Sequence, residues 1–206
     1  MTTLTVVRKG DEIAIAADTL TTFGSTRVAD HYKGDHAKIL QFGDNRIGIC
    51  GSSAHHLAVT SLLKREKSLD LSSRQAVFET FRHLHPRLKD EYFLNPKEED
   101  TAPYESSQLE ALIANPHGIF SIFSYREAFE YDRFWAVGSG YRYALGAMYA
   151  VYDRIDSAAE IARQGVLAGC EFDTSSGGPV VVHSFPIRAD RGDEDRAVPK
   201  QKRKQK

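Results

Sequence analysis

The sequence lacks the features that would place the protein outside the cytoplasm or beside nucleic acid. Its 206 residues include only two cysteines, Cys50 and Cys170, too few for a disulfide framework and in keeping with a reducing compartment. No apolar run approaches the roughly 20 residues that span a bilayer. The first residues lack the basic and apolar segments of a signal peptide. Since the formal net charge is only −1, nothing favours nucleic acid or an anionic membrane. We therefore expect a cytoplasmic protein without either partner.

Motifs for metals and cofactors are also missing. The sequence has no glycine-rich phosphate-binding loop. The pairs His55-His56 and His83-x-His85 do not share a helix face, and no cysteine or carboxylate completes a ligand set for them. We interpret these histidines as surface or capping residues, and we predict no metal and no cofactor.

Apolar residues make up 41% of the chain and charged residues 27%, and their spacing predicts strands and helices in two similar runs. The strand-like segments are residues 3–8, 12–17, 38–42, 46–50, 109–114, 119–123, a hairpin pair within 128–137, and 179–185. The helix-like segments are about 57–65, a helix capped by Ser72 or Ser73 and stopped by Pro86, 143–155, and a helix opened by the capping box Ser157-Ala158-Ala159-Glu160. This order predicts an α+β fold of two packed sheets flanked by helices.

The domain organisation follows from length and composition. A chain of this length can bury one sizeable core, so we expect a single domain over residues 1–187. Residues 91–107 are polar and contain Pro96 and Pro103, which indicates a surface loop. Residues 188–206 are charged and poor in apolar residues, which predicts a disordered tail.

Four separated parts of the sequence carry residues suited to catalysis. They are Thr2-Thr3, Ala17-Asp18, Ala37-Lys38-Ile39, and two glycine-rich motifs, Gly138-Ser139-Gly140 and Asp173-Thr174-Ser175-Ser176-Gly177-Gly178. Each has an ordinary alternative: a turn, a solvated lysine, or a helix cap. The first glycine-rich motif is not the nucleophile elbow of α/β-hydrolases, because Val137 and Tyr141 stand where that motif needs glycine.

In this order and spacing, these segments resemble the proteasome β-subunit family, which includes the bacterial HslV peptidase and smaller bacterial proteasome homologues. The stretch Ala136–Gly140 followed by Tyr143–Ala147 is similar to the strand-to-helix signature of the family. The resemblance covers roughly residues 2–187. The Met-Thr start together with the Asp173 motif, which HslV lacks, favours the β-proteobacterial homologue. The resemblance implies a four-layer αββα sandwich of the N-terminal-nucleophile hydrolase type.

The resemblance also implies a threonine peptidase whose nucleophile is Thr2 after removal of Met1. A threonine hydroxyl needs a base, and a terminal α-amine, with a reference pKa of about 7.7–8.0, can supply one. Lys38 matches the lysine of the family, with Lys33 as a competing assignment, and Asp18 would pair with it. The remaining catalytic candidates, which would orient the amine, are Ser139, Asp173 and Ser176.

Substrate contacts are assigned by the same resemblance. The candidates are Thr22 and, from the strand that lines the S1 pocket, Arg46, Ile47, Gly48, Ile49 and Gly51. Backbone N–H groups within residues 48–51 would stabilise the oxyanion. Acidic P1 residues are favoured if Arg46 projects into the pocket, and apolar ones if Ile47 or Ile49 does. The register is left open, because a slip of one residue reverses the face.

The family further implies polypeptide substrates and a homo-oligomer of two stacked rings. Rings of seven are favoured, as in the bacterial homologues, and rings of six are the HslV alternative. An ATP-dependent unfoldase is a further candidate partner. Two other functions compete with peptidase activity: a non-catalytic ring scaffold, and an amidohydrolase of the same fold that acts on small amides.

Overall fold

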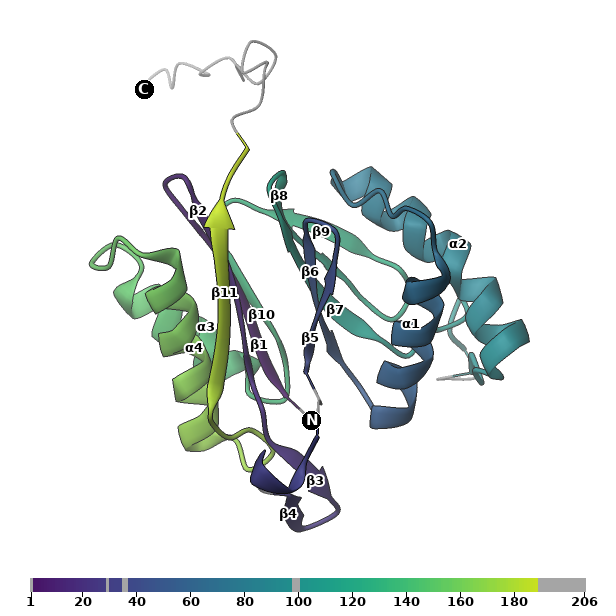
Figure 1. The fold of residues 1–206 in the computed structure, drawn as a ribbon, viewed down its shortest axis with the longest axis horizontal. Coiled ribbons are helices and arrows are strands. Elements are labelled where there is room, and N and C mark those ends of the chain that lie inside the picture. Colours follow the sequence, from purple (N-terminus) through teal and green to yellow (C-terminus); the bar gives the residue numbers. More distant parts are fainter. Residues whose placement is uncertain (1, 29, 35–36, 98–100, 189–206) are drawn as a thin grey trace, which may run out of the picture.

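The computed structural model describes residues 2–28, 30–34, 37–97 and 101–188, and its strands form two large sheets (Figure 1). The first sheet has the order β10-β1-β2-β11 and the second the order β5-β6-β7-β8-β9, beside a small β3-β4 ribbon. The strands are β1 (Thr3–Lys9), β2 (Glu12–Asp18), β3 (Thr21–Phe23), β4 (Thr26–Val28), β5 (Ile39–Phe42), β6 (Asn45–Cys50), β7 (Glu110–Asn115), β8 (Gly118–Ile122), β9 (Ala128–Tyr131), β10 (Phe134–Gly138) and β11 (Val180–Pro186).

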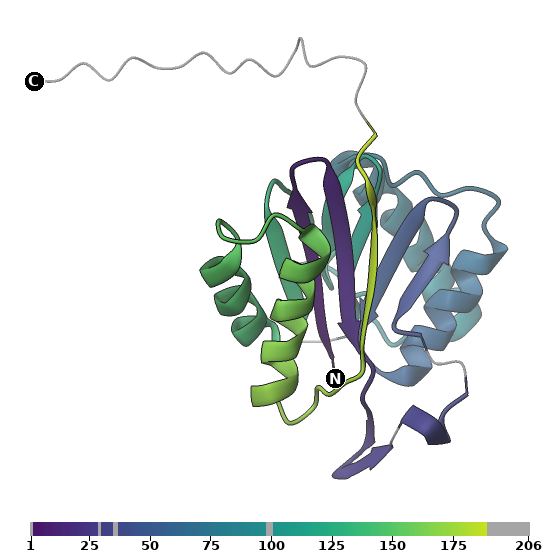
Figure 2. The same cartoon turned by 60° about the vertical axis from the view of Figure 1, so that its left-hand side comes forward.

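Four helices cover the outer faces of the two sheets. Helices α3 (Tyr141–Val151) and α4 (Ala158–Phe172) lie on the first sheet, as Figure 2 shows from the side. Helices α1 (Ser53–Arg65) and α2 (Arg74–Tyr92) lie on the second sheet. The layers are therefore helix, sheet, sheet and helix, which confirms the predicted α+β fold and its four-layer αββα sandwich.

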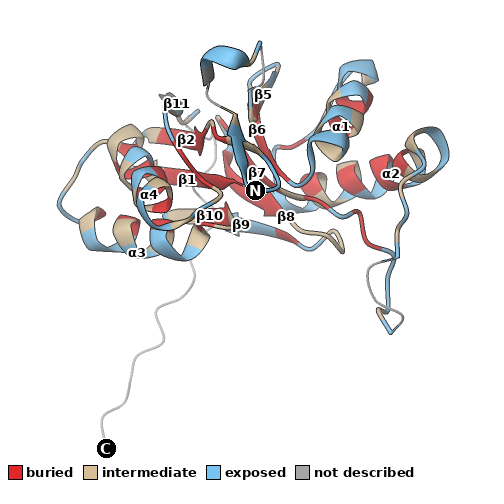
Figure 3. Cartoon of the chain, turned by 90° about the horizontal axis from the view of Figure 1, so that it is seen from below, coloured by how far each residue is buried: buried red, intermediate tan, exposed pale blue. Residues whose placement is uncertain are grey.

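Three apolar clusters fill the spaces between the layers. One lies between α3, α4 and the first sheet, one between the two sheets, and one between the second sheet and α1 and α2. Strand β1 supplies two of them by alternation: Leu4 and Val6 face the second sheet, while Val7 faces the helices. Thr5, on the helix side, is also buried, and its hydroxyl donates to the Ala162 carbonyl at 3.0 Å. Buried residues accordingly run along the central strands in Figure 3.

Helix α2 is longer than the sequence predicted, because it does not stop at Pro86 but continues to Tyr92. An interior proline removes a backbone hydrogen bond and costs about 3 kcal/mol. Beyond the proline, Leu88 is buried and Tyr92 and Leu94 pack against the same core, and each buried side chain contributes about 1.5–3 kcal/mol. Burial therefore outweighs the proline, and the helix ends only at Phe93, whose backbone is left-handed with φ of 57°.

The predicted hairpin within residues 128–137 is also wrong. Strand β9 pairs with β8 in the second sheet, whereas β10 pairs with β1 in the first. The chain thus crosses from one sheet to the other between Tyr131 and Phe134. Alternation predicts a strand but not its neighbour, because it shows which face of a strand is buried and not which strand pairs with it.

Two predicted irregular segments, the loop over residues 91–107 and the tail over residues 188–206, are only partly covered by the described residues. The loop predicted over residues 91–107 starts after α2, and Ser106 and Ser107 at its far end are buried rather than at the surface. At the other end, the N–H of Arg188 donates to the Pro116 carbonyl at 2.8 Å. The rest of the predicted tail, residues 189–206, lies outside the described residues. Within the described part of the chain, no helix has the length and apolar character needed to cross a membrane.

Candidate active site

The candidate site lies where three strands of the first sheet end together. The antiparallel register places Thr3 opposite Gly138 and Leu4 opposite Ala17. The start of β1, the end of β2 and the end of β10 therefore meet at the same end of the sheet. Thr2, which immediately precedes β1, is buried there, with 4% of its surface exposed.

The Asp18 side chain accepts several hydrogen bonds at this end of the sheet. It is fully buried, and its carboxylate accepts four hydrogen bonds. Lys38 donates from Nζ at 2.8 Å, and the backbone N–H of Thr3 donates at 3.0 Å. The N–H groups of Leu20 and Gly177 donate to the second oxygen at 3.2 and 3.0 Å. Such a set fixes the position of the carboxylate, which in turn holds the Lys38 ammonium beside the start of β1.

The two candidate lysines have different environments. Lys38 pairs with Asp18, and 12% of its side chain is exposed. Lys33 instead donates to the carbonyl oxygen of Thr19. Of the two lysines, Lys38 is therefore the one that is paired with the buried Asp18.

A second polar cluster lies on the other side of Thr2. Ser139 and Ser176 each donate to Oδ2 of Asp173 at 2.6 Å, and the Ser139 hydroxyl is 3.4 Å from the Thr2 carbonyl oxygen. Ser176 also lies 2.7 Å from the Thr3 hydroxyl. Burial raises the pKa of Asp173, but the hydrogen bonds from both serines outweigh it and hold the pKa below its usual value.

Glycines allow these segments to approach each other. Gly138 has φ of +90°, and a Cβ there would stand 2.1 Å from the Thr2 carbonyl oxygen. A Cβ on Gly140 or Gly169 would stand 2.0 or 2.3 Å from the Thr3 hydroxyl. Because these distances are far below contact, a side chain at any of the three would displace the start of β1.

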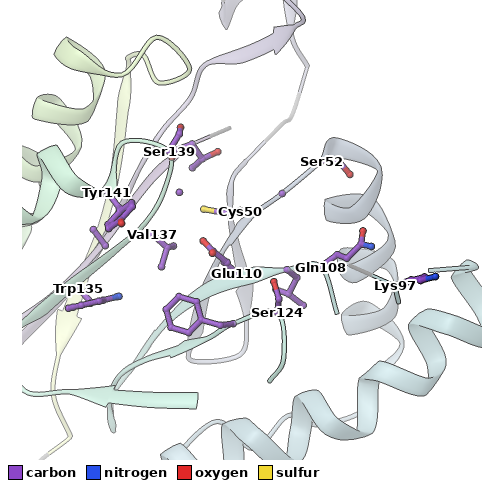
Figure 4. A pocket seen from close by; sticks show the side chains of 16 residues that line it. Cys50, Ser52, Lys97, Gln108, Glu110, Ser124, Trp135, Val137, Ser139 and Tyr141 are labelled. Atoms are coloured by element: carbon purple, nitrogen blue, oxygen red, sulfur yellow. Dashed lines mark hydrogen bonds between the residues drawn. The ribbon is translucent and has the colours of Figure 1, made fainter. Parts of the chain in front are cut away.

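Two cavities meet at Thr2, and both are also lined by Gly51 and Ser52. The smaller, of about 350 Å³, is lined by Thr2, Leu20, Thr21, Thr22, Phe23, Ala37, Lys38, Ile49, Gly51, Ser52, Ser53 and His56. The larger, of about 1060 Å³ (Figure 4), is lined by Thr2, Cys50, Gly51, Ser52, Lys97, Gln108, Leu109, Glu110, Phe123, Ser124, Trp135, Ala136, Val137, Gly138, Ser139 and Tyr141. A substrate bound across Thr2 has room on both sides.

The predicted substrate-binding residues separate into two groups. Thr22, Ile49 and Gly51 line the smaller cavity. Ile47 packs in the core beneath α1 and α2, and Gly48 is buried against Leu4. The remaining candidate, Arg46, lines a different cavity together with His183. An acidic P1 preference set by Arg46 therefore has no support in this geometry.

Several lining residues were missed by the sequence interpretation. His56, read there as a surface or capping residue, lines the smaller cavity, and Glu110 and Trp135 line the larger one. No motif marks these positions, since each reaches the site only through strand pairing or helix packing. A charged residue at the start of an otherwise apolar strand, as at Glu110, was the one available signal.

Cys50 lies beside the catalytic candidates without being one. A Cβ on Gly138 would be 3.0 Å from its sulfur, so the thiol is close to Thr2. Burial raises the pKa of the Cys50 thiol, and the Glu110 carboxylate raises it further. A neutral buried thiol is a poor nucleophile, so Cys50 does not compete with Thr2.

The four-layer αββα sandwich is the fold of the N-terminal-nucleophile hydrolases. No family model matches the chain, but solved structures do. BPH of Thiobacillus denitrificans is 39% identical, with a TM-score of 0.86 over 91% of this chain and 100% of that chain. Its structure in complex with epoxomicin matches with a TM-score of 0.84 and 39% identity, over 90% and 99%. The chain therefore belongs to the proteasome β-subunit and HslV-like family, among its bacterial homologues.

A more distant match agrees with this assignment at the level of the fold. Eukaryotic HslV from Trypanosoma brucei is 19% identical, with a TM-score of 0.66 over 89% of this chain and 99% of that chain. Together, these structures identify the protein as a proteasome-type subunit with a hydrolase fold.

Proposed function

We propose that the protein is a threonine endopeptidase whose nucleophile is Thr2, exposed by removal of Met1. One observation carries the proposal: the Asp18–Lys38 ion pair and the Ser139–Asp173–Ser176 cluster converge on Thr2 from two sides. A structural role alone does not require an ammonium, two hydroxyls and two carboxylates around one buried threonine.

In the proposed reaction, the freed α-amine of Thr2 takes the proton of its own hydroxyl. The Thr2 oxygen then bonds to the peptide carbonyl carbon, and backbone N–H groups at the end of β6, such as that of Gly51, stabilise the oxyanion. The amine returns the proton to the leaving nitrogen as the C–N bond breaks. Water then hydrolyses the ester and restores the hydroxyl.

The surrounding groups set the pKa and the orientation of the Thr2 α-amine. The positive charge of Lys38 keeps the amine neutral near physiological pH, because a nearby like charge lowers its pKa. Asp18 holds the ammonium in place, and Ser139 orients the amine with the support of Asp173. Ser176 donates to the same oxygen of the Asp173 carboxylate as Ser139 and so helps to fix it.

The smaller cavity receives the side chain before the cleaved bond. Its walls include Leu20, Phe23 and Ile49, and Ile49 belongs to the strand that the family resemblance assigns to this pocket. We therefore expect apolar P1 residues, with Thr22 and Gly51 contacting the substrate backbone.

We further propose that the subunits assemble into two stacked rings of seven, with rings of six as the alternative. The family relationship supports a ring-forming homo-oligomer, and exposed Tyr143, Leu167 and Phe172 on α3 and α4 offer apolar surface for neighbouring subunits. Native mass spectrometry decides between fourteen and twelve protomer masses. A separate ATP-dependent unfoldase and the cytoplasmic location remain predictions.

The decisive test is the intact mass of the purified protein before and after a threonine-directed electrophile. We expect a mass without Met1 and one adduct, mapped to Thr2. A retained Met1 or an unmodified Thr2 refutes the peptidase and favours the scaffold alternative. Hydrolysis of small amides without peptide cleavage would instead favour the amidohydrolase. Since BPH was solved with epoxomicin, this compound is also expected to inhibit.

Variants separate the catalytic roles from assembly. Thr2→Ala and Lys38→Ala should each lower peptide hydrolysis by at least about 1000-fold, while the ring mass is unchanged. Lys33→Ala is the matched control and should retain activity, because its ammonium contacts the Thr19 carbonyl rather than Asp18. An active Lys38→Ala together with an inactive Lys33→Ala would reverse the assignment of the lysine.

A further inference from the structure

The larger cavity holds one negative charge close to Thr2. Strand pairing places Glu110 directly opposite Cys50, and Cys50 is the residue whose sulfur lies beside Thr2 and Gly138. Paired residues of neighbouring strands have Cβ atoms about 4.5–5.5 Å apart. In Figure 4 the Glu110 carboxylate accordingly lies next to Cys50.

This carboxylate has no cation of its own. Among the residues that the structure describes, none forms an ion pair or side-chain hydrogen bond with Glu110. The other charged residue of the lining is Lys97, which is exposed and lies at the opposite edge of the cavity in Figure 4. A half-buried carboxylate without a cation attracts a positive ligand more strongly than a surface carboxylate does.

The walls around Glu110 suit a long cationic side chain. Phe123, Trp135 and Tyr141 line the same cavity, and the ring of Trp135 is held by stacking on Tyr131 at a centroid distance of 5.0 Å. Aromatic faces contact the methylene stem of lysine or arginine and attract the charged head group.

The cavity lies on the leaving-group side of Thr2. In the proposed reaction, the amine that Ser139 orients passes a proton to the leaving nitrogen, so that nitrogen must lie near Ser139. Ser139 and Gly138 line the larger cavity, whereas the apolar pocket for the preceding side chain is on the other side, around Ile49.

We propose that Glu110 makes this cavity a subsite for a lysine or arginine within the two residues that follow the cleaved bond. This inference rests on the proposed peptidase activity and adds its substrate class: polypeptides cut after an apolar residue, with a basic residue in one of the next two positions. Glu110 is a specificity-determining residue and takes no part in bond breaking.

The test uses quenched fluorescent peptides with one apolar P1 residue and lysine, norleucine or glutamate at each of the two following positions. Norleucine keeps the methylene stem of lysine and removes its charge. We expect the full-length protein to cleave the lysine peptide with about tenfold higher kcat/KM than the norleucine peptide, and the glutamate peptide most slowly. The ratio should fall as salt is raised.

Variants of the full-length protein assign the preference to this carboxylate. Glu110→Gln should bring the lysine-to-norleucine ratio close to one, and Glu110→Lys should make the glutamate peptide the better substrate. Glu127→Gln is the matched control, because Glu127 is exposed and lines a different cavity, and it should keep the wild-type ratio.

The outcomes separate this inference from the peptidase proposal. Cleavage of all peptides at similar rates, or an unchanged ratio in Glu110→Gln, overturns the subsite and leaves the peptidase standing. If the wild-type protein cleaves no peptide and takes no adduct at Thr2, the peptidase fails and the subsite fails with it.

Discussion

Replacing Asp18 with asparagine tests whether its buried carboxylate organises the site. The carboxylate has no exposed surface and accepts from Lys38, Thr3, Leu20 and Gly177. An asparagine keeps the shape but only one accepting oxygen, so its NH2 group faces two of these donors. The charge that balances the ammonium is lost as well.

The cost follows from those contacts. Each buried donor left without an acceptor costs about 1–3 kcal/mol, and removing one partner of a buried ion pair costs about 3–5 kcal/mol in total. Since Lys38 retains some access to water, we expect the lower part of that range for Asp18→Asn. Lys38→Met should cost less, because the carboxylate keeps its three backbone donors.

The assay is equilibrium unfolding in guanidinium chloride at pH 7 and a fixed protomer concentration, since assembly contributes to apparent stability. Asp44→Asn is the control: its exposed carboxylate lies 3.8 Å from Arg188, and a surface pair of this kind is worth less than about 1 kcal/mol. The reasoning is refuted if Asp18→Asn stays within about 1 kcal/mol of the wild type, or if Lys38→Met is the more destabilising change.

Three other properties can be tested directly. Gly138→Ala should abolish activity and lower the melting temperature, because its Cβ would meet the Thr2 carbonyl. Gly146 has open space around it, so Gly146→Ala should instead raise the stability of helix α3 by about 0.5–1 kcal/mol. Burial raises the pKa of Cys170 from 9.0 to about 11, so thiol modification at pH 8 should be about 100-fold slower in the native than in the unfolded protein; equal rates would contradict this burial. The pKa of Asp173 is lowered on folding, so its stabilisation is present above about pH 4 and lost as pH falls further; thermal unfolding of Asp173→Asn should show a shallower acid loss.

Much of the fold could be predicted from the sequence, because the strands and helices of each layer have a local pattern of apolar and polar residues. Alternation and turns predicted the strands of both sheets, and the predicted helix start at Ser157 was confirmed by the hydrogen bond that its hydroxyl accepts from the N–H of Glu160. The errors arose where a long-range contact overrode a local rule. Pro86 is tolerated because α2 buries its apolar face, and β9 and β10 separate because each finds a different partner strand.

The sequence by itself determined the chemical types of the site and their order along the chain. Thr2, Asp18, Lys38 and the Ser139 and Asp173 motifs could be selected as candidates because, taken together, their order and spacing resemble those of a known family. Pairing and packing decided the rest. The register of β6 turned Ile49 toward one cavity and left Arg46 in another, and the pairing of β6 with β7 placed Glu110 beside Cys50. Such positions depend on contacts between residues far apart in the chain, which no local pattern encodes.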